Sequence, residues 1–152
     1  MVDSKLLVEF AKHPQLAFQK LSYVLDFLES SDETEVSCAT DLLENCGAPG
    51  LAEIAYLCEQ LKSKQPPRIY WCSTLLGRLG AAWGNTEERR RVQMELCQVI
   101  GDESLELSAR ERAAWAIAEI GTVDSGCRAL LKTRVGMAPP RLKRLLETAL
   151  AT

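Results

Sequence analysis

Apolar residues recur at intervals of three and four positions along most of the chain, and no stretch alternates apolar and polar residues with a period of two. Intervals of three and four place side chains on one face of an α-helix, whereas a half-buried strand requires alternation. Each stripe spans three or four helical turns, and prolines and glycines separate the stripes. Pro14, for example, separates an expected helix over residues 3–12 from a longer one over residues 15–29. The pattern predicts an all-α protein of nine short helices covering roughly three quarters of the chain.

Residues that begin or end helices lie between the stripes. Asp32 with Glu35, and Ser108 with Glu111, have the spacing of a capping box, in which each side chain accepts a hydrogen bond from an unpaired backbone N–H group. Glycines follow several stripes, at the position where a residue in the left-handed conformation commonly ends a helix. These glycines are Gly47, Gly80, Gly101, Gly121 and Gly136.

Three of the expected helices end in the same way. Residues 38–47, 71–80 and 112–121 share a small residue, three further positions, a large apolar residue, two positions, an apolar residue and a final glycine. These glycines lie 33 and 41 residues apart, and a second helix follows each of them. Because a period in this range built from helix pairs is typical of solenoids, the chain is expected to be a helical-repeat protein.

These segments resemble HEAT or HEAT-like repeats of the armadillo superfamily, whose bacterial version has a first helix that reads Arg-x-x-Ala-Ala-x-x-Leu-Gly-x-Leu/Ile-Gly. Residues 110–121 are the most similar, and residues 68–80 retain Gly77 and Gly80. The resemblance implies a right-handed α-solenoid of about four to five antiparallel helix pairs. It implies one domain over residues 1–152, with an N-terminal helical cap (1–31), repeats (32–137) and a C-terminal capping helix (138–152).

In HEAT-like proteins the second helix of each pair usually lines the concave face. The resemblance therefore implies a binding face made by residues 51–64, 87–100 and 123–135. The leading hypothesis is a non-enzymatic scaffold that binds a partner protein or peptide on this face. Some HEAT-like proteins attach or detach tetrapyrrole pigments and others excise DNA bases, so a lyase-type enzyme subunit is an alternative.

Charge is distributed unevenly along the chain, whose net charge is −3. Residues 1–66 carry five basic and eleven acidic side chains, a net charge of −6, whereas residues 67–152 carry thirteen basic and ten acidic ones, a net charge of +3. The overall acidity argues against a nucleic-acid partner, although a local basic patch that binds nucleic acid or another phosphate ligand is a further alternative.

Basic residues fall on two of the expected second helices, and one tryptophan lies in a glycine-flanked loop. If both helices line one face, their basic side chains form a single patch that attracts an acidic protein or peptide segment. Positions 89 and 91 differ by about 200° around a helix, so the adjacent arginines cannot all face outward. The candidate partner-binding residues are Arg89, Arg90, Arg91, Arg128, Lys132, Arg134 and Trp83.

The cysteines are Cys38, Cys46, Cys58, Cys72, Cys97 and Cys127, with no Cys-x-x-Cys spacing among them. Several lie on apolar stripes, which predicts buried, reduced thiols; a structural metal or a redox pair is the alternative. The one histidine, His13, lies at a helix boundary with no catalytic partner identifiable in the sequence. We expect no catalytic residue, no cofactor and no metal, and hence no enzyme.

The longest unbroken apolar run, residues 113–118, is too short to cross a bilayer. The first residues also lack the pattern of a signal peptide, since Glu9 interrupts the first apolar stretch. A cytoplasmic location without membrane contact is therefore expected.

Overall fold

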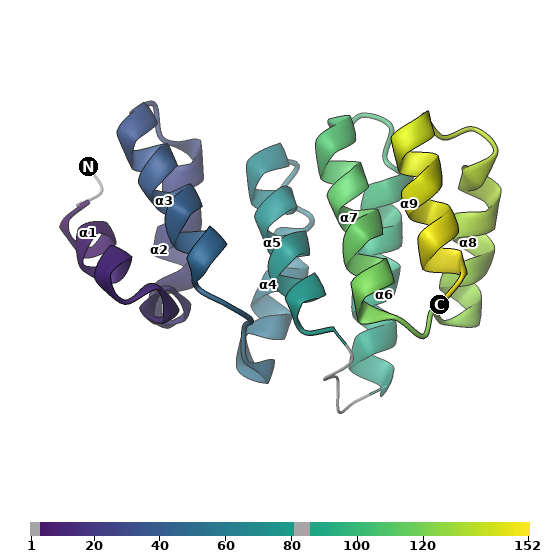
Figure 1. Cartoon of the computed structure of the whole chain (residues 1–152), viewed down its shortest axis with the longest axis horizontal. Coiled ribbons are helices and arrows are strands. Elements are labelled where there is room, and N and C mark those ends of the chain that lie inside the picture. The colour runs from purple at the N-terminus through teal and green to yellow at the C-terminus, as the bar shows by residue number, and fades with distance from the viewer. Residues whose placement is uncertain (1–3, 81–85) are drawn as a thin grey trace. The chain divides into compact units, whose positions relative to one another are not determined.

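The computed structural model describes residues 4–80 and 86–152, of which α- and 3-10 helices together make up 78%, with no strand (Figure 1). The predicted all-α class and helix content are confirmed, and the described residues contain the nine α-helices that the stripes predict. The chain divides into two compact units, Met1–Pro49 and Gly50–Thr152. The single domain expected from the resemblance stays a prediction, and each unit is described by itself.

The first unit contains three α-helices and two 3-10 segments. They are α1 (Lys5–Lys12), η1 (Pro14–Lys20), α2 (Leu21–Asp26), η2 (Phe27–Glu29) and α3 (Glu33–Asn45). The single helix expected over residues 15–29 is therefore wrong in part, because 3-10 segments take up both of its ends. The core of this unit gathers apolar side chains from all five segments, among them Leu7, Ala17, Leu25, Leu28 and Leu43.

The N-terminus of α3 is capped by Asp32, as the spacing predicts. The Asp32 carboxylate accepts a hydrogen bond from the N–H group of Thr34 at 2.9 Å. Glu35 does not accept from the Asp32 N–H group as a capping box requires. That N–H group donates to the Ser30 hydroxyl at 3.1 Å, and the hydroxyl donates to Glu35 at 2.7 Å. The Ser30 hydroxyl therefore connects the Asp32 N–H group to the Glu35 carboxylate.

The second unit arranges its α-helices in two layers (Figure 1). Its elements are η3 (Leu51–Glu53), α4 (Ile54–Gln60), α5 (Pro66–Arg78), α6 (Thr86–Gly101), α7 (Leu107–Ile120), α8 (Ser125–Val135) and α9 (Pro140–Leu150). Helix α7 packs between α5 and α9 in one layer, and α4, α6 and α8 lie behind them. The core between the layers includes Ile69, Leu76, Leu96, Ile117 and Leu146, each fully buried.

Helices α5 and α7 approach each other closely because small residues lie between them. Ala113 and Ala116 on α7 are fully buried. A Cβ atom placed on Gly77 of α5 would lie 2.6 Å from the Trp115 ring and 3.1 Å from the Cα atom of Ala116. Glycine is therefore required at position 77 for α5 and α7 to pack at this distance.

The three glycines of the shared helix ending all have positive φ: 81° at Gly47, 53° at Gly80 and 70° at Gly121. The prediction is wrong for Gly101, which is the last residue of α6, and for Gly136, whose φ is −66°.

The predicted capping box of Ser108 and Glu111 is also wrong. Helix α7 begins one residue earlier, at Leu107, and Glu106 precedes it without a side-chain capping bond. The Glu111 carboxylate lies 3.2 Å from Nε of Arg141 on α9. Glu111 therefore links α7 to α9 and takes no part in a helix cap.

The prediction of six reduced thiols is wrong for one pair. Cys97 on α6 and Cys127 on α8 form a disulfide, with Cα atoms 6.5 Å apart. Both lie on buried apolar stripes, and because these stripes face each other across the interface, packing the helices brings the sulfur atoms together. The other four cysteines are free, three of them buried and Cys38 partly exposed.

Among the described residues, His, Cys, Asp and Glu side chains do not gather in a group of three or more that could hold a metal ion. In the same residues no helix has both the length and the apolar character needed to span a membrane.

Candidate interaction surface on helices α6 and α8

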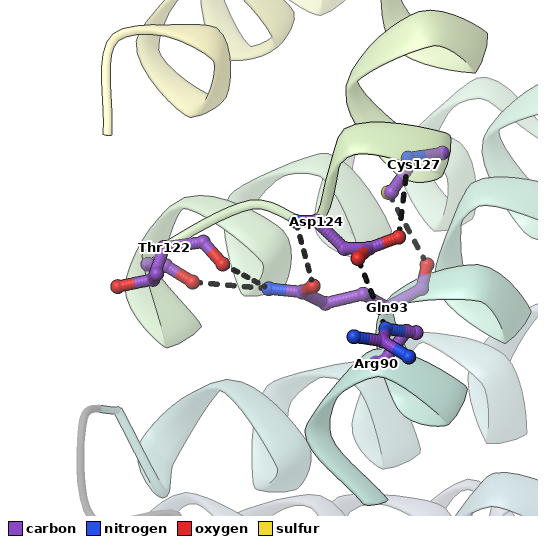
Figure 2. Close-up of polar contacts among 7 residues, drawn as sticks. Arg90, Gln93, Thr122, Asp124 and Cys127 are labelled. Atoms are coloured by element: carbon purple, nitrogen blue, oxygen red, sulfur yellow. Dashed lines mark hydrogen bonds and ion pairs between the residues drawn. The ribbon is translucent and has the colours of Figure 1, made fainter. Parts of the chain in front are cut away.

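Helices α6 and α8, which carry six of the predicted partner-binding residues, pack against each other in the second unit. Their junction is polar at the N-terminus of α8 (Figure 2). Asp124 caps α8 by accepting from the N–H group of Gly126 at 3.1 Å, and its second oxygen lies 3.0 Å from Arg90 Nε. The Arg90 guanidinium therefore links α6 to the start of α8.

Gln93, one turn beyond Arg90, is completely buried and spans the same junction (Figure 2). Its side-chain N–H group donates to the Gly121 carbonyl at 3.0 Å, and its side-chain oxygen accepts from the Asp124 N–H group at 3.2 Å. The amide therefore satisfies backbone groups on both sides of the turn between α7 and α8. Sequence analysis missed Gln93 and Asp124; a polar residue within an apolar stripe and an Asp directly before a helix were the available signals.

Arg128 faces away from α6, toward the C-terminus of α9. Its guanidinium donates to the carbonyl of Leu150 and, at 2.8 Å, to that of Thr152. These carbonyls lie at the negative end of the helix dipole, where a cation is stabilising. Lys132 follows Arg128 by one turn on the same side of α8 and is exposed. The single patch expected from the sequence is therefore divided between two sides of α8.

The arginines before Gln93 also point in different directions. Arg91 is exposed, and its charge acts on the Cys58 thiol of α4. Arg89 is half-buried. Trp83 lies outside the described residues, so its predicted role stays a prediction. Of the predicted residues, the structure thus places Arg91 toward α4, Arg90 toward the start of α8, and Arg128 toward α9.

Two hollows adjoin along the exposed side of α6. One, of about 360 Å³, lies between α6 and α8, and the other, of about 210 Å³, lies between α6 and the segment that follows α4. Gln98 and Asp102 line both. The first is also lined by Cys97, Gly101, Leu130, Leu131 and Arg134, and the second by Leu61, Lys62, Lys64, Glu95, Val99 and Leu105.

Asp102, at the boundary of the two hollows, has its charge offset within the chain. Lys64 Nζ lies 2.6 Å from one carboxylate oxygen, and the hydroxyl and N–H groups of Ser104 donate to the other. The hydrogen bond from Lys64, followed by those from Ser104, lowers the pKa of Asp102 from 3.8 to about 2. Lys62 similarly lies 3.8 Å from Glu95 and 3.7 Å from Glu59.

Arg134 lies at the rim of the hollow between α6 and α8, over the last residue of α6. A Cβ atom placed on Gly101 would lie 3.0 Å from Arg134 Nη2, so the guanidinium rests against bare backbone. Arg134 is exposed, and no hydrogen bond or ion pair joins its side chain to another described residue. The guanidinium N–H donors of Arg134 therefore have no acceptor among the described residues.

The layer of α5, α7 and α9 uses its aromatic residues for packing. The Arg112 guanidinium lies 3.9 Å from the centre of the Trp115 ring and 5.0 Å from that of Tyr70, and it donates to Thr74 at 2.7 Å. Trp71 is buried, with 7% of its surface exposed. Trp71 therefore packs within the second unit, and Trp115 contacts Arg112 within the same chain.

No known family model and no curated protein matches the chain. The functional proposal therefore rests on the fold and on the surface of α4, α6 and α8.

Proposed function

We propose that this chain is a HEAT-like helical-repeat module that binds a partner protein or peptide, through an acidic segment, on the face made by α4, α6 and α8. In this proposal the helix pairs continue as a right-handed solenoid, and α4, α6 and α8 are the second helices that line its concave side. The module acts as a scaffold and performs no chemistry of its own.

Two recurring details support the repeat. The helix endings that share a sequence pattern, at Gly47, Gly80 and Gly121, all have positive φ. In addition, one arginine near the start of α5 and one near the start of α7 each reach back to the second helix of the preceding pair. Arg68 donates to Gln60 on α4 at 2.9 Å, and Arg110 donates to the Ile100 carbonyl on α6 at 2.9 Å. Both arginines thus contact the end of the preceding second helix, Arg68 at a side-chain oxygen and Arg110 at a backbone carbonyl, as expected when successive units are similar.

The observation that carries the binding proposal is the pair of hollows that share Gln98 and Asp102. Together they follow α6 with the segment after α4 on one side and α8 on the other, which gives an extended segment a continuous path along α6. The concave surfaces of helical-repeat proteins are their usual binding sites.

The charges of this face favour an acidic segment. Lys62, Lys64 and Arg90 are paired with acids of the chain itself, which keeps those acids from repelling a negative partner. Arg91 and Arg134 remain exposed on either side of α6. Opposite charge across such a surface speeds association and selects partners more than it adds affinity.

The test selects short peptides from a random display library against the full chain and measures their affinities for surface variants. The double variant Arg91→Glu, Arg134→Glu should weaken binding of the selected peptides by about tenfold or more. The control Lys143→Glu, Arg144→Glu makes the same charge change on exposed residues of α9 and should leave the affinity unchanged. Thermal unfolding of both variants should match the parent, because exposed charges contribute little to stability.

Three results would contradict the proposal: no peptide is enriched, the enriched peptides lack acidic residues, or both double variants weaken binding equally. Mixed-sequence DNA is tested beside the peptides. Tighter binding to DNA than to any selected peptide, with a steep dependence on salt, would assign this face to a phosphate backbone instead.

A further inference from the structure

The hollow between α6 and α8 has an apolar floor that is only partly covered. Cys97 and Leu131 are buried there, and Gly101 contributes backbone without a side chain. Leu130 lines the same hollow and has 42% of its surface exposed. An apolar side chain left open beside a buried floor gains free energy when the apolar group of a partner covers it.

A cationic group adjoins this floor. The Arg134 guanidinium lies against Gly101 at the rim and is not paired with any described side chain. Its planar set of N–H donors matches the two oxygens of a carboxylate. Since Leu130 and Arg134 are one turn apart on α8, a ligand that reaches both needs its apolar and acidic groups close together.

Asp102, the acidic residue that lines this hollow, does not pair with Arg134 in place of the ligand's carboxylate. The Asp102 carboxylate is engaged by Lys64 at 2.6 Å and by Ser104. It therefore needs no further cation. A partner's carboxylate at the rim can therefore bind Arg134, and the negative charge of Asp102 is already neutralised by Lys64.

We infer that this hollow is the anchor point of the proposed surface and takes an apolar side chain next to an acidic one from the partner segment. The apolar side chain covers Leu130 above the floor of Cys97 and Leu131, and the neighbouring carboxylate binds Arg134 through two parallel hydrogen bonds. The inference rests on the proposed function and adds the sequence feature that the partner must carry.

The experiment titrates acetyl-Leu-Glu-amide into the isotope-labelled full chain and follows backbone and arginine side-chain resonances by NMR. We expect saturable shifts at Gln98, Leu130 and Arg134, with a dissociation constant on the order of 1 mM. Acetyl-Ser-Glu-amide and acetyl-Leu-Gln-amide each lack one of the two groups and should bind about tenfold more weakly.

Two surface variants and a matched control locate the contacts. Arg134→Gln should weaken acetyl-Leu-Glu-amide about tenfold, and Leu130→Ser should abolish the advantage of the leucine peptide over the serine peptide. Lys132→Gln removes the same charge from the opposite side of α8 and should change nothing. Unchanged spectra away from α8 show that each variant is folded.

The inference is overturned if the dipeptide produces no saturable shifts, if the serine peptide binds equally well, or if Lys132→Gln has the effect of Arg134→Gln. Inorganic phosphate that displaces the dipeptide at equal strength would also overturn it, because Arg134 would then be a simple anion site. A different result would contradict the proposed function: peptides selected from the display library bind the Arg91→Glu, Arg134→Glu variant as tightly as the parent. If the selected peptides depend on Arg91 and Arg134 but the dipeptides do not bind, this inference is wrong and the proposed function stands.

Discussion

Single residues set the spacing and the turns of the second unit. Gly77 allows α5 to lie against Trp115 and Ala116 of α7, and Gln93 joins α6 to the turn between α7 and α8. Neither contact was predicted from the sequence. The resemblance included Gly77 without indicating what it contacts, and the backbone partners of Gln93 are 28 or more residues away and follow only from the packing.

Gly77→Ala tests the close approach of α5 and α7. We expect the variant to be destabilised by about 1–3 kcal/mol, because the new methyl group must displace the Trp115 ring or the α7 backbone. Gly136→Ala is the control, since its φ is −66° and a Cβ atom there meets nothing within 4 Å. Denaturant unfolding of both variants measures the effect. A Gly77→Ala protein as stable as the parent would show that the helices are not so close.

Gln93→Leu tests the buried amide. The substitution leaves the Gly121 carbonyl and the Asp124 N–H group without their partner, and burying unsatisfied groups costs about 1–3 kcal/mol. Gln98→Leu makes the same change on an exposed position of α6 and should alter stability by less than about 0.5 kcal/mol. Equal unfolding midpoints for the two variants would contradict the role assigned to Gln93.

Helices as elements were largely predictable from their apolar stripes, and their mutual contacts were not. The stripes predict the helices of both units, yet the 3-10 ends of residues 14–29 depend on tertiary packing that a periodicity does not record. Arg128 illustrates the same limit for the candidate surface. The sequence correctly predicted that Arg128 lies on a helix. Its contact with the end of α9 depends on how α8 and α9 pack and could not be predicted.

The disulfide between α6 and α8 predicts a specific count of free thiols. Unfolded without reductant, the chain should offer four thiols to alkylation, and with reductant all six. In the folded chain Cys38 should react first, because burial raises the pKa of Cys58 to about 11 and that of Cys72 to about 12. Mass spectrometry counts the labels, and Cys127→Ser should abolish the difference between the two conditions. Six labels without reductant would restore the original prediction.

This disulfide also bears on the location expected from the sequence. Disulfides are uncommon in cytoplasmic proteins, where thiols are kept reduced. The oxidised pair and a cytoplasmic location are therefore in tension, and the location stays a prediction.

The contact between Lys64 and Asp102 predicts how the link between α6 and the segment after α4 responds to acid. The pKa of Asp102 is lowered from 3.8 to about 2 in the folded chain. The contact therefore stabilises the folded protein at pH values above 3.8. This stabilisation is lost as the pH falls from 3.8 through about 2. Carboxyl resonances in an NMR titration measure the pKa directly. Lys64→Met should return it toward 3.8, and a parent protein that already titrates there would contradict the contact.

For the molecule as a whole, we propose a helical-repeat fold with one binding face. The sequence indicated the class of fold and the helices of that face. It did not show that Arg90 and Arg128 are used within the chain while Arg134 is left at the rim of a hollow, because those assignments depend on neighbouring helices. The proposed function therefore requires that a partner segment lies on α4, α6 and α8 of the second unit.

Photo-crosslinking tests this claim most directly. A selected peptide carrying a benzophenone side chain is crosslinked to the full chain, and the attached residues are mapped by mass spectrometry. We expect attachment on α4, α6 and α8, around Gln98, Leu130 and Arg134, and loss of attachment in the Arg91→Glu, Arg134→Glu variant. Attachment confined to α5, α7 and α9, or to the first unit, would contradict it.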